Sequence, residues 1–155
     1  MTEPRLLAYV FGLCIFLTFG RVGSEMIRPD ATADLDRMGW LAAQVFAGFS
    51  FLPLALYGAA ALIGLICRSV GGIGTYRDTR LAFFWSGLAA GPVALLAQLA
   101  ATATASATLG SALSGLVWLV LLCPMLAAAH EFRLIRVGAA LMSLVAIAFA
   151  LRAFG

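Results

Sequence analysis

Residues 38–67 read MGWLAAQVFAGFSFLPLALYGAAALIGLIC, an apolar stretch that contains no charged side chain. A helix needs about 20 mostly apolar residues to cross the roughly 30 Å of hydrocarbon in a bilayer. Because this stretch is longer, we expect its helix to tilt, bend or protrude from the membrane. The run is continuous and does not alternate with polar residues, as the strands of a membrane barrel do. It therefore predicts a membrane-spanning helix.

The composition of the whole chain has the same character. Of 155 residues, 63% are hydrophobic and 11% are charged, and the mean hydropathy is +1.04. Soluble domains are about 45–50% apolar and about 25% charged, so this chain has too few charges to coat a globule in water. We expect an integral membrane protein. The small net charge of +3 and the lack of a basic patch with interleaved aromatics argue against a nucleic-acid partner.

Five apolar segments predict an all-α fold, a polytopic bundle of five transmembrane helices forming a single domain over residues 1–155. The expected helices are about 6–26, 38–67, 80–101, 109–129 and 134–153. The first segment also resembles the charged and apolar regions of a secretory signal. Its only A-x-A stretch, residues 31–33, lies too far beyond the apolar run for cleavage, so we expect this segment to remain a helix.

The distribution of arginine predicts how the bundle is oriented, because cytoplasmic loops carry an excess of basic residues. With five spans, one side holds six arginines and the other side holds four. We therefore expect a cytoplasmic N-terminus and a periplasmic C-terminus. All ten basic residues are arginine, which together with heavy alanine and glycine usage favours a bacterial source and hence a bacterial inner membrane.

Residues 67–80, CRSVGGIGTYRDTR, form a glycine-rich connector. A phosphate-binding P-loop requires a lysine after its glycines, and this chain has none. A dinucleotide fingerprint requires a third glycine and a preceding strand, which are also missing. We instead expect a sharp turn whose glycines permit positive φ, followed by a capping box between a threonine and an aspartate. The residues of this predicted turn are Gly71, Gly72, Gly74, Thr75 and Asp78.

Two groups of charged residues are predicted to contact lipid headgroups or a partner. Arg68, Arg77 and Arg80 flank the glycine turn, where anionic headgroups attract basic side chains. Arg21 and Glu25 lie four residues apart near the end of the first helix, where they are expected to pair across one turn.

Prolines and small residues are predicted to shape helix packing. Pro53, Pro92 and Pro124 each lie inside one of the middle helices and are expected to kink it. Gly87 and Gly91 form a G-x-x-x-G pair that allows close helix approach. Kinked helices are also found at the binding sites of transporters, so a polar cavity near the prolines would favour transport, whereas a dry core would argue against it.

The sequence shows no catalytic, cofactor-binding or metal-binding constellation. His130 and Glu131 are the only pair that resembles a chemical site, and a zinc site would need at least three protein ligands. We interpret the pair as an interfacial helix cap. The three cysteines have unrelated spacings and are expected to be small buried hydrophobes rather than disulfide partners. These are Cys14, Cys67 and Cys123.

The stretch 57–96, YGAAALIGLICRSVGGIGTYRDTRLAFFWSGLAAGPVALL, resembles the central region of the YIP (Ypt/Rab-interacting protein) family in its bacterial branch. The resemblance consists of a long apolar helix, a GG-x-G-(Ser/Thr)-aromatic turn, an R-L-A-x-x-W helix start and a proline in that helix. These features fall on Gly71, Gly72, Gly74, Thr75, Tyr76, Arg80, Leu81, Ala82, Trp85 and Pro92. The family resemblance implies five spanning helices with a cytoplasmic N-terminus, and it supplies no catalytic residues.

From these features we expect a membrane protein that is not an enzyme and has no cofactor of its own. The leading hypothesis is an accessory or structural subunit, or an assembly factor, of a larger bacterial membrane complex such as a respiratory or photosynthetic one. Its partners would be membrane lipids and other integral membrane subunits. The alternative is a small transporter or a protein that handles lipids or organises the membrane. Bound lipids, pigments or quinones held by apolar contacts alone would leave no motif.

Overall fold

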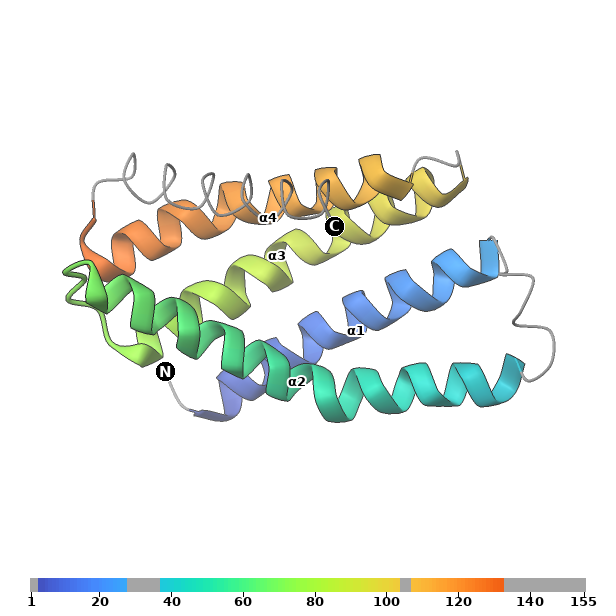
Figure 1. Ribbon diagram of the computed structural model, residues 1–155, viewed down its shortest axis with the longest axis horizontal. Helices are drawn as coiled ribbons and strands as arrows, with labels where there is room; N and C mark the ends of the chain where they lie inside the picture. The colour runs from blue at the N-terminus through green and yellow to red at the C-terminus, as the bar shows by residue number, and fades with distance from the viewer. Residues whose placement is uncertain (1–2, 28–36, 104–106, 133–155) are drawn as a thin grey trace, which may run out of the picture.

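The computed structural model describes residues 3–27, 37–103 and 107–132 of the chain. Within these residues the protein is all-helical (Figure 1). Its helices are α1 (Glu3–Ile27), α2 (Arg37–Ser69), α3 (Tyr76–Ala103) and α4 (Ala107–His130). Each described helix is long and apolar enough to cross a membrane, which indicates an integral membrane protein.

The predicted all-α, membrane-spanning character is confirmed, but the number and bounds of the helices differ from the prediction. The structure describes four helices rather than five, and the fifth predicted segment, 134–153, lies outside the described residues. The first helix begins at Glu3 rather than near residue 6. The third begins at Tyr76 rather than near residue 80, because the capping residues precede the apolar run and include a polar first turn in the helix.

The helices alternate in direction, so α1 and α3 run parallel to each other and antiparallel to α2 and α4. Figure 1 shows the start of α1, the glycine turn and the end of α4 at one end of the molecule. We call this the turn end. The end of α1, the start of α2, the end of α3 and the start of α4 lie at the opposite end. In this arrangement α3 is central, packing against α1, α2 and α4.

Glycines allow the parallel helices α1 and α3 to approach each other closely. A Cβ atom at Gly12 would lie 2.9 Å from Leu88, and one at Gly23 would lie 2.8 Å from Leu99. The relation also holds in reverse, because a Cβ atom at Gly87 would lie 2.7 Å from a methyl carbon of Leu13. Large side chains of each helix thus occupy the spaces above glycines of the other, the packing that small residues permit in membranes.

The best-packed part of the bundle lies toward the turn end and is built on the first half of α3. Phe83 and Phe84 are almost fully buried there. The ring of Phe84 meets that of Tyr57 at 4.9 Å, and the ring of Phe83 meets that of Trp118 at 5.0 Å, both edge-on. These aromatic contacts tie α2 and α4 to the central helix, with geometry favourable for ring pairs.

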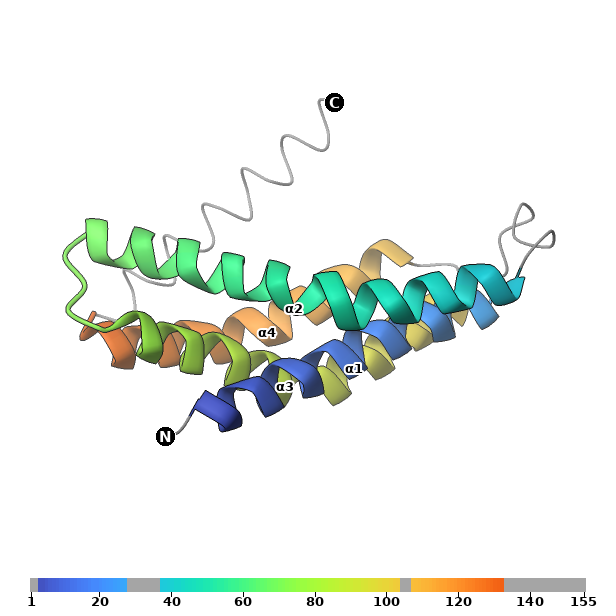
Figure 2. The same ribbon diagram turned by 90° about the horizontal axis from the view of Figure 1, so that it is seen from below.

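The helix α2 has the least contact with the rest of the described bundle. Its fully buried residues, Gly48, Ala60, Gly64 and Cys67, are few for its length. The helix bends about halfway along (Figures 1 and 2), and Pro53 lies inside it near that point. A proline removes one backbone hydrogen bond, which accounts for a bend of this kind.

Candidate functional site

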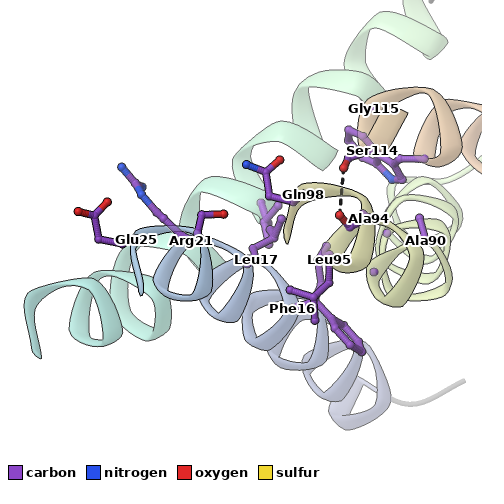
Figure 3. A pocket seen from close by; sticks show the side chains of 17 residues that line it. Phe16, Leu17, Arg21, Glu25, Ala90, Ala94, Leu95, Gln98, Ser114 and Gly115 are labelled. Carbon is purple, nitrogen blue, oxygen red and sulfur yellow. Dashed lines mark hydrogen bonds between the residues drawn. The ribbon is translucent and has the colours of Figure 1, made fainter. Parts of the chain in front are cut away.

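A pocket of about 510 Å³ lies between α1, α3 and α4 (Figure 3), and Leu56 of α2 also lines it. This volume is within the range of roughly 300–1,000 Å³ that is usual for small-molecule sites. The lining residues are Leu13, Phe16, Leu17, Gly20, Arg21, Ser24, Glu25, Leu56, Gly87, Ala90, Gly91, Ala94, Leu95, Gln98, Ser114, Gly115 and Trp118.

Small residues create this space. Gly87, Ala90, Gly91 and Ala94 follow one another at helical spacing along the α3 wall, where Leu13 and Phe16 of α1 pack over the two glycines. On the other wall, Gly115 of α4 has no heavy atom of a described residue within 4 Å of where a Cβ atom would be. The open space therefore lies beside Gly115, whereas the glycines of α3 allow α1 to pack closely.

The lining of the pocket changes from apolar to polar along its length. The deep end, nearest the middle of the bundle, is lined by Leu13, Phe16, Leu56 and Trp118. The other end is lined by Arg21, Ser24, Glu25 and Gln98, and Figure 3 shows Arg21 and Glu25 at the far end of the α1 wall. The pocket thus has one apolar end and one polar end.

The length of the pocket corresponds to about one membrane leaflet. Its α1 wall runs from Leu13 to Glu25, which at about 1.5 Å rise per residue spans about 18 Å. Half of a hydrocarbon core of about 30 Å is about 15 Å. The apolar end therefore lies near the middle of the predicted span, and the polar end lies where headgroups would be.

Hydrogen bonds fix the walls of the pocket. The Ser114 hydroxyl lies 2.7 Å from the carbonyl oxygen of Gly110 and 3.1 Å from that of Ala94, so it links α4 to α3. The indole N–H of Trp118 donates to the Ser86 hydroxyl at 3.1 Å. These bonds satisfy polar groups inside the bundle, where water is scarce, and they hold the α3 and α4 walls together.

The hydroxyls near the polar end are also paired. Those of Ser24 and Thr102 lie 3.2 Å apart and join α1 to α3. Within the described residues, the side-chain amide of Gln98 makes no hydrogen bond, although it lines the pocket. An amide in this position can both donate to and accept from a polar ligand group.

The predicted transport feature, a polar cavity beside the three prolines, does not match the pocket. Pro53, Pro92 and Pro124 do not line it, and Pro92 and Pro124 are exposed on the outer surfaces of α3 and α4. Gly91, which precedes Pro92, does line it, and a Cβ atom there would lie 2.6 Å from the ring of Phe16. The polar groups of the pocket gather at one end instead.

The glycine turn adopts the predicted turn with its capping box, but only one of its glycines needs positive φ. Gly71 has φ of 92°. Its N–H donates to the carbonyl of Arg68 at 3.1 Å, and that of Gly72 donates to the carbonyl of Cys67 at 2.9 Å. This pair of bonds is the Schellman motif that ends many helices at a glycine.

The capping box at the start of α3 is reciprocal. The backbone N–H of Thr75 donates to the Asp78 carboxylate at 3.1 Å, and the backbone N–H of Asp78 donates to the Thr75 hydroxyl at 3.2 Å. The Thr75 hydroxyl also donates to the Asp78 carboxylate at 2.6 Å. Aspartate thus fills the role that glutamate usually has in this motif.

Gly72 and Gly74 are small for a different reason, which is contact with the end of α4. A Cβ atom at Gly72 would lie 2.6 Å from Nδ1 of His130, and one at Gly74 would overlap the carbonyl oxygen of Ala129. The sequence-based explanation, positive φ at all three glycines, was therefore wrong for these two. The turn packs directly on α4.

His130 is the centre of this contact and not the interfacial cap that we expected. It is only 1% exposed, its Nε2 lies 2.8 Å from the Thr79 hydroxyl, and its ring stacks on Phe132. Glu131 is exposed, has φ of 56° and lies at the position that glycine usually takes after a helix. Among the described residues no group of His, Cys, Asp or Glu is arranged to hold a metal ion.

The predicted charged contacts fall at opposite ends of the molecule. Arg68 and Arg77 are exposed at the turn end, where the guanidinium of Arg68 lies 5.0 Å from the centre of the Tyr76 ring. Arg80 lies 5.9 Å from the centre of the Tyr57 ring. Arg21 and Glu25 lie together at the polar end of the pocket. The structure therefore separates the two groups by most of the length of the bundle.

Sequence reasoning missed the pocket itself. Its signal was a run of small residues on one face of α3, of which we singled out only Gly87 and Gly91 as packing positions. Comparison of the chain with protein-family models, curated proteins and solved structures gives no match. The resemblance to the YIP family stays a prediction.

Proposed function

We propose that this chain is a non-enzymatic integral membrane protein that handles lipids, holding an amphiphilic molecule in the pocket between α1, α3 and α4. The observation that carries the proposal is the graded lining, apolar near the middle of the bundle and polar about 18 Å away. An amphiphile in a leaflet has the same length scale and the same order of apolar and polar parts.

The location of the polar groups supports binding rather than passage of a solute. A transport path needs polar groups or water along its length, whereas the deep end here is lined by Leu13, Phe16 and Leu56. An apolar tail would gain contacts with these side chains. The polar part of the amphiphile would meet Gln98 and Arg21, which a fully apolar occupant could not satisfy.

The experiment is to purify the full chain in a mild detergent and to identify the lipids that accompany it by mass spectrometry. We expect an amphiphile in stoichiometric amount. Gly115→Leu should abolish its retention, because the open space at this position allows a larger side chain to enter the pocket. Gly58→Leu is the matched control, since Gly58 has equally open surroundings on α2 but does not line the pocket. Equal lipid content in all three proteins would overturn the proposal.

A second candidate is the accessory subunit of a larger membrane complex, and Gly58 favours it. Most described helix glycines lie against a side chain of another helix, but Gly58 is exposed, and no heavy atom of a described residue lies within 4 Å of a Cβ placed there. Glycine in a helix is less favourable than alanine by about 0.5–1 kcal/mol. A small residue here would be explained by a helix of another subunit that approaches α2 closely.

The same two variants test this candidate, but here Gly58→Leu is the disruptive variant and Gly115→Leu is the control. Purification from the native membrane should recover a larger complex with the unmodified chain and with Gly115→Leu, but not with Gly58→Leu. Recovery of the chain without other subunits would exclude the accessory function.

A bacterial inner membrane with a cytoplasmic N-terminus remains part of the proposal, supported by the arginine distribution. Reporter fusions at residue 73 and at the N-terminus should both report the cytoplasm.

A further inference from the structure

The residues that line the pocket indicate more about its ligand than the amphiphilic character on which the proposed function rests. We propose that it binds an acyl-chain amphiphile with an anionic headgroup, taken from the leaflet opposite the turn end, with the headgroup at Arg21. This inference presupposes the lipid-handling function. It adds the charge of the headgroup, the direction of the chain and the leaflet that supplies it.

The charge follows from the residues at the polar end. Arg21 lies on the exposed surface of α1 at the mouth of the pocket, and its guanidinium can donate several hydrogen bonds to a carboxylate or phosphate. Glu25, one turn away, already takes part in an interaction within the structure. Gln98 and Ser24 add neutral polar groups beside them. Arg21 is therefore the basic side chain at this end of the pocket, beside the carboxylate of Glu25, and it is the group that an anionic headgroup would meet.

The direction of the chain follows from the order of the lining residues. Leu17 and Leu95 come next after the polar end, and Phe16 and Ala90 lie deeper (Figure 3). An acyl tail would extend from Arg21 past Leu17 toward Leu13, parallel to the helices. The opposite direction would place an anionic headgroup among apolar side chains near the middle of the membrane, where charge is strongly disfavoured.

The position of the polar end of the pocket in the bundle indicates which leaflet supplies the ligand. Arg5, Arg68, Arg77 and Arg80 lie on the helix ends of the turn end, whereas Arg21 lies near the other end of α1 (Figures 1 and 3). The polar end of the pocket lies toward that other end. In the orientation that we propose, its ligand would come from the periplasmic leaflet.

The test is photocrosslinking of the purified full chain in lipid nanodiscs, with palmitic acid carrying a diazirine at the chain terminus as the probe. Crosslinks should map to the deep end, at Leu13, Phe16 and Trp118. A second probe, lysophosphatidylglycerol with the diazirine in its headgroup, should crosslink near Arg21 and Ser24. The reverse pattern of crosslinks would overturn the direction and therefore the leaflet.

The charge is tested by substitution. Arg21→Gln should weaken the binding of palmitic acid roughly five- to tenfold, the usual effect of one arginine near an anionic headgroup. Arg21→Lys should retain most of the affinity. Arg77→Gln is the matched control, because Arg77 is an exposed arginine at the turn end, and it should have no effect. Palmityl alcohol, which has the same chain without the charge, should bind the unmodified chain and Arg21→Gln equally.

The outcomes separate this inference from the proposed function. If palmityl alcohol binds as tightly as palmitic acid, or if Arg21→Gln and Arg77→Gln behave alike, the anionic selectivity is overturned while the amphiphile pocket stands. If neither probe labels the pocket residues and Gly115→Leu changes nothing, the lipid-handling function itself is overturned. Preference for palmitic acid over lysophosphatidylglycerol, or the reverse, identifies a free fatty acid or a phospholipid product as the source of the anion.

Discussion

The turn end and the pocket use the same kind of residue for opposite purposes. At the turn end, Gly72 and Gly74 are small because His130 and the carbonyl of Ala129 occupy the space that a side chain would need. In the pocket, Gly115 is small and no heavy atom of a described residue lies within 4 Å of a Cβ placed there. Glycine therefore permits close contact in one region and leaves a cavity in the other.

The polar groups of the turn end and of the pocket also differ. At the turn end, Thr75, Asp78, Thr79 and Nε2 of His130 bond to one another or to nearby backbone, although the buried Nδ1 of His130 has no hydrogen-bond partner within the described residues. At the polar end of the pocket, the Gln98 amide makes no hydrogen bond within the described residues. Satisfied polar groups stabilise a fold, whereas polar groups that face a cavity are available to a ligand. The two regions therefore differ in where their polar groups point, which is into a packed contact at the turn end and toward a cavity at Gln98.

The largest expected effect comes from placing a methyl group at the turn end. Gly74→Ala would push Cβ into the carbonyl of Ala129, which is backbone and cannot rotate away. We expect a loss of about 3 kcal/mol in the free energy of unfolding, at the upper end of what overpacking usually causes. Thermal unfolding in a mild detergent measures it. A loss below about 0.5 kcal/mol would show that the turn does not pack on α4 as described.

The second expected effect concerns the buried hydrogen bond of the turn end. Thr79→Val keeps the shape of the side chain but removes the hydroxyl that lies 2.8 Å from Nε2 of His130. Leaving a buried polar group unsatisfied costs about 1–3 kcal/mol, so we expect a destabilisation of about 2 kcal/mol. Thr102→Val is the control near the pocket, where loss should stay below about 1 kcal/mol because Ser24 remains accessible from the cavity. Equal losses would remove the distinction between the regions.

The third prediction makes the same change, glycine to alanine, in the pocket. Gly115→Ala adds a methyl group where no heavy atom of a described residue lies within 4 Å, and alanine is more favourable than glycine in a helix by about 0.5–1 kcal/mol. We therefore expect a stabilisation of about that amount, opposite in sign to Gly74→Ala. A destabilisation in the same thermal unfolding experiment would mean that the pocket is filled by protein and not available to a ligand.

Local features of the structure could be predicted from the sequence, whereas features made by distant residues could not. The capping box of Thr75 and Asp78 was predictable because its two members are three residues apart and act through their own backbone. The burial of His130 was not, since it depends on the turn reaching the end of α4 across about fifty residues of chain. The pocket likewise depends on which faces of α1, α3 and α4 meet, and small residues alone do not specify this.

The smallest expected effect concerns the end of α4, where a residue other than glycine has positive φ. Glu131, with φ of 56°, precedes Phe132, whose N–H donates to the carbonyl of Ala127 at 2.9 Å, so the backbone repeats the motif at Gly71. Glu131→Gly relieves this conformation and should stabilise the protein by about 0.5 kcal/mol, seen as a small rise in the thermal midpoint. Glu131→Ala removes the same carboxylate but keeps a Cβ atom, and should give no gain. An equal gain from both variants would show that the gain comes from removing the exposed carboxylate and not from relieving the backbone. The preference for glycine that explains the end of α2 would then not apply at the end of α4.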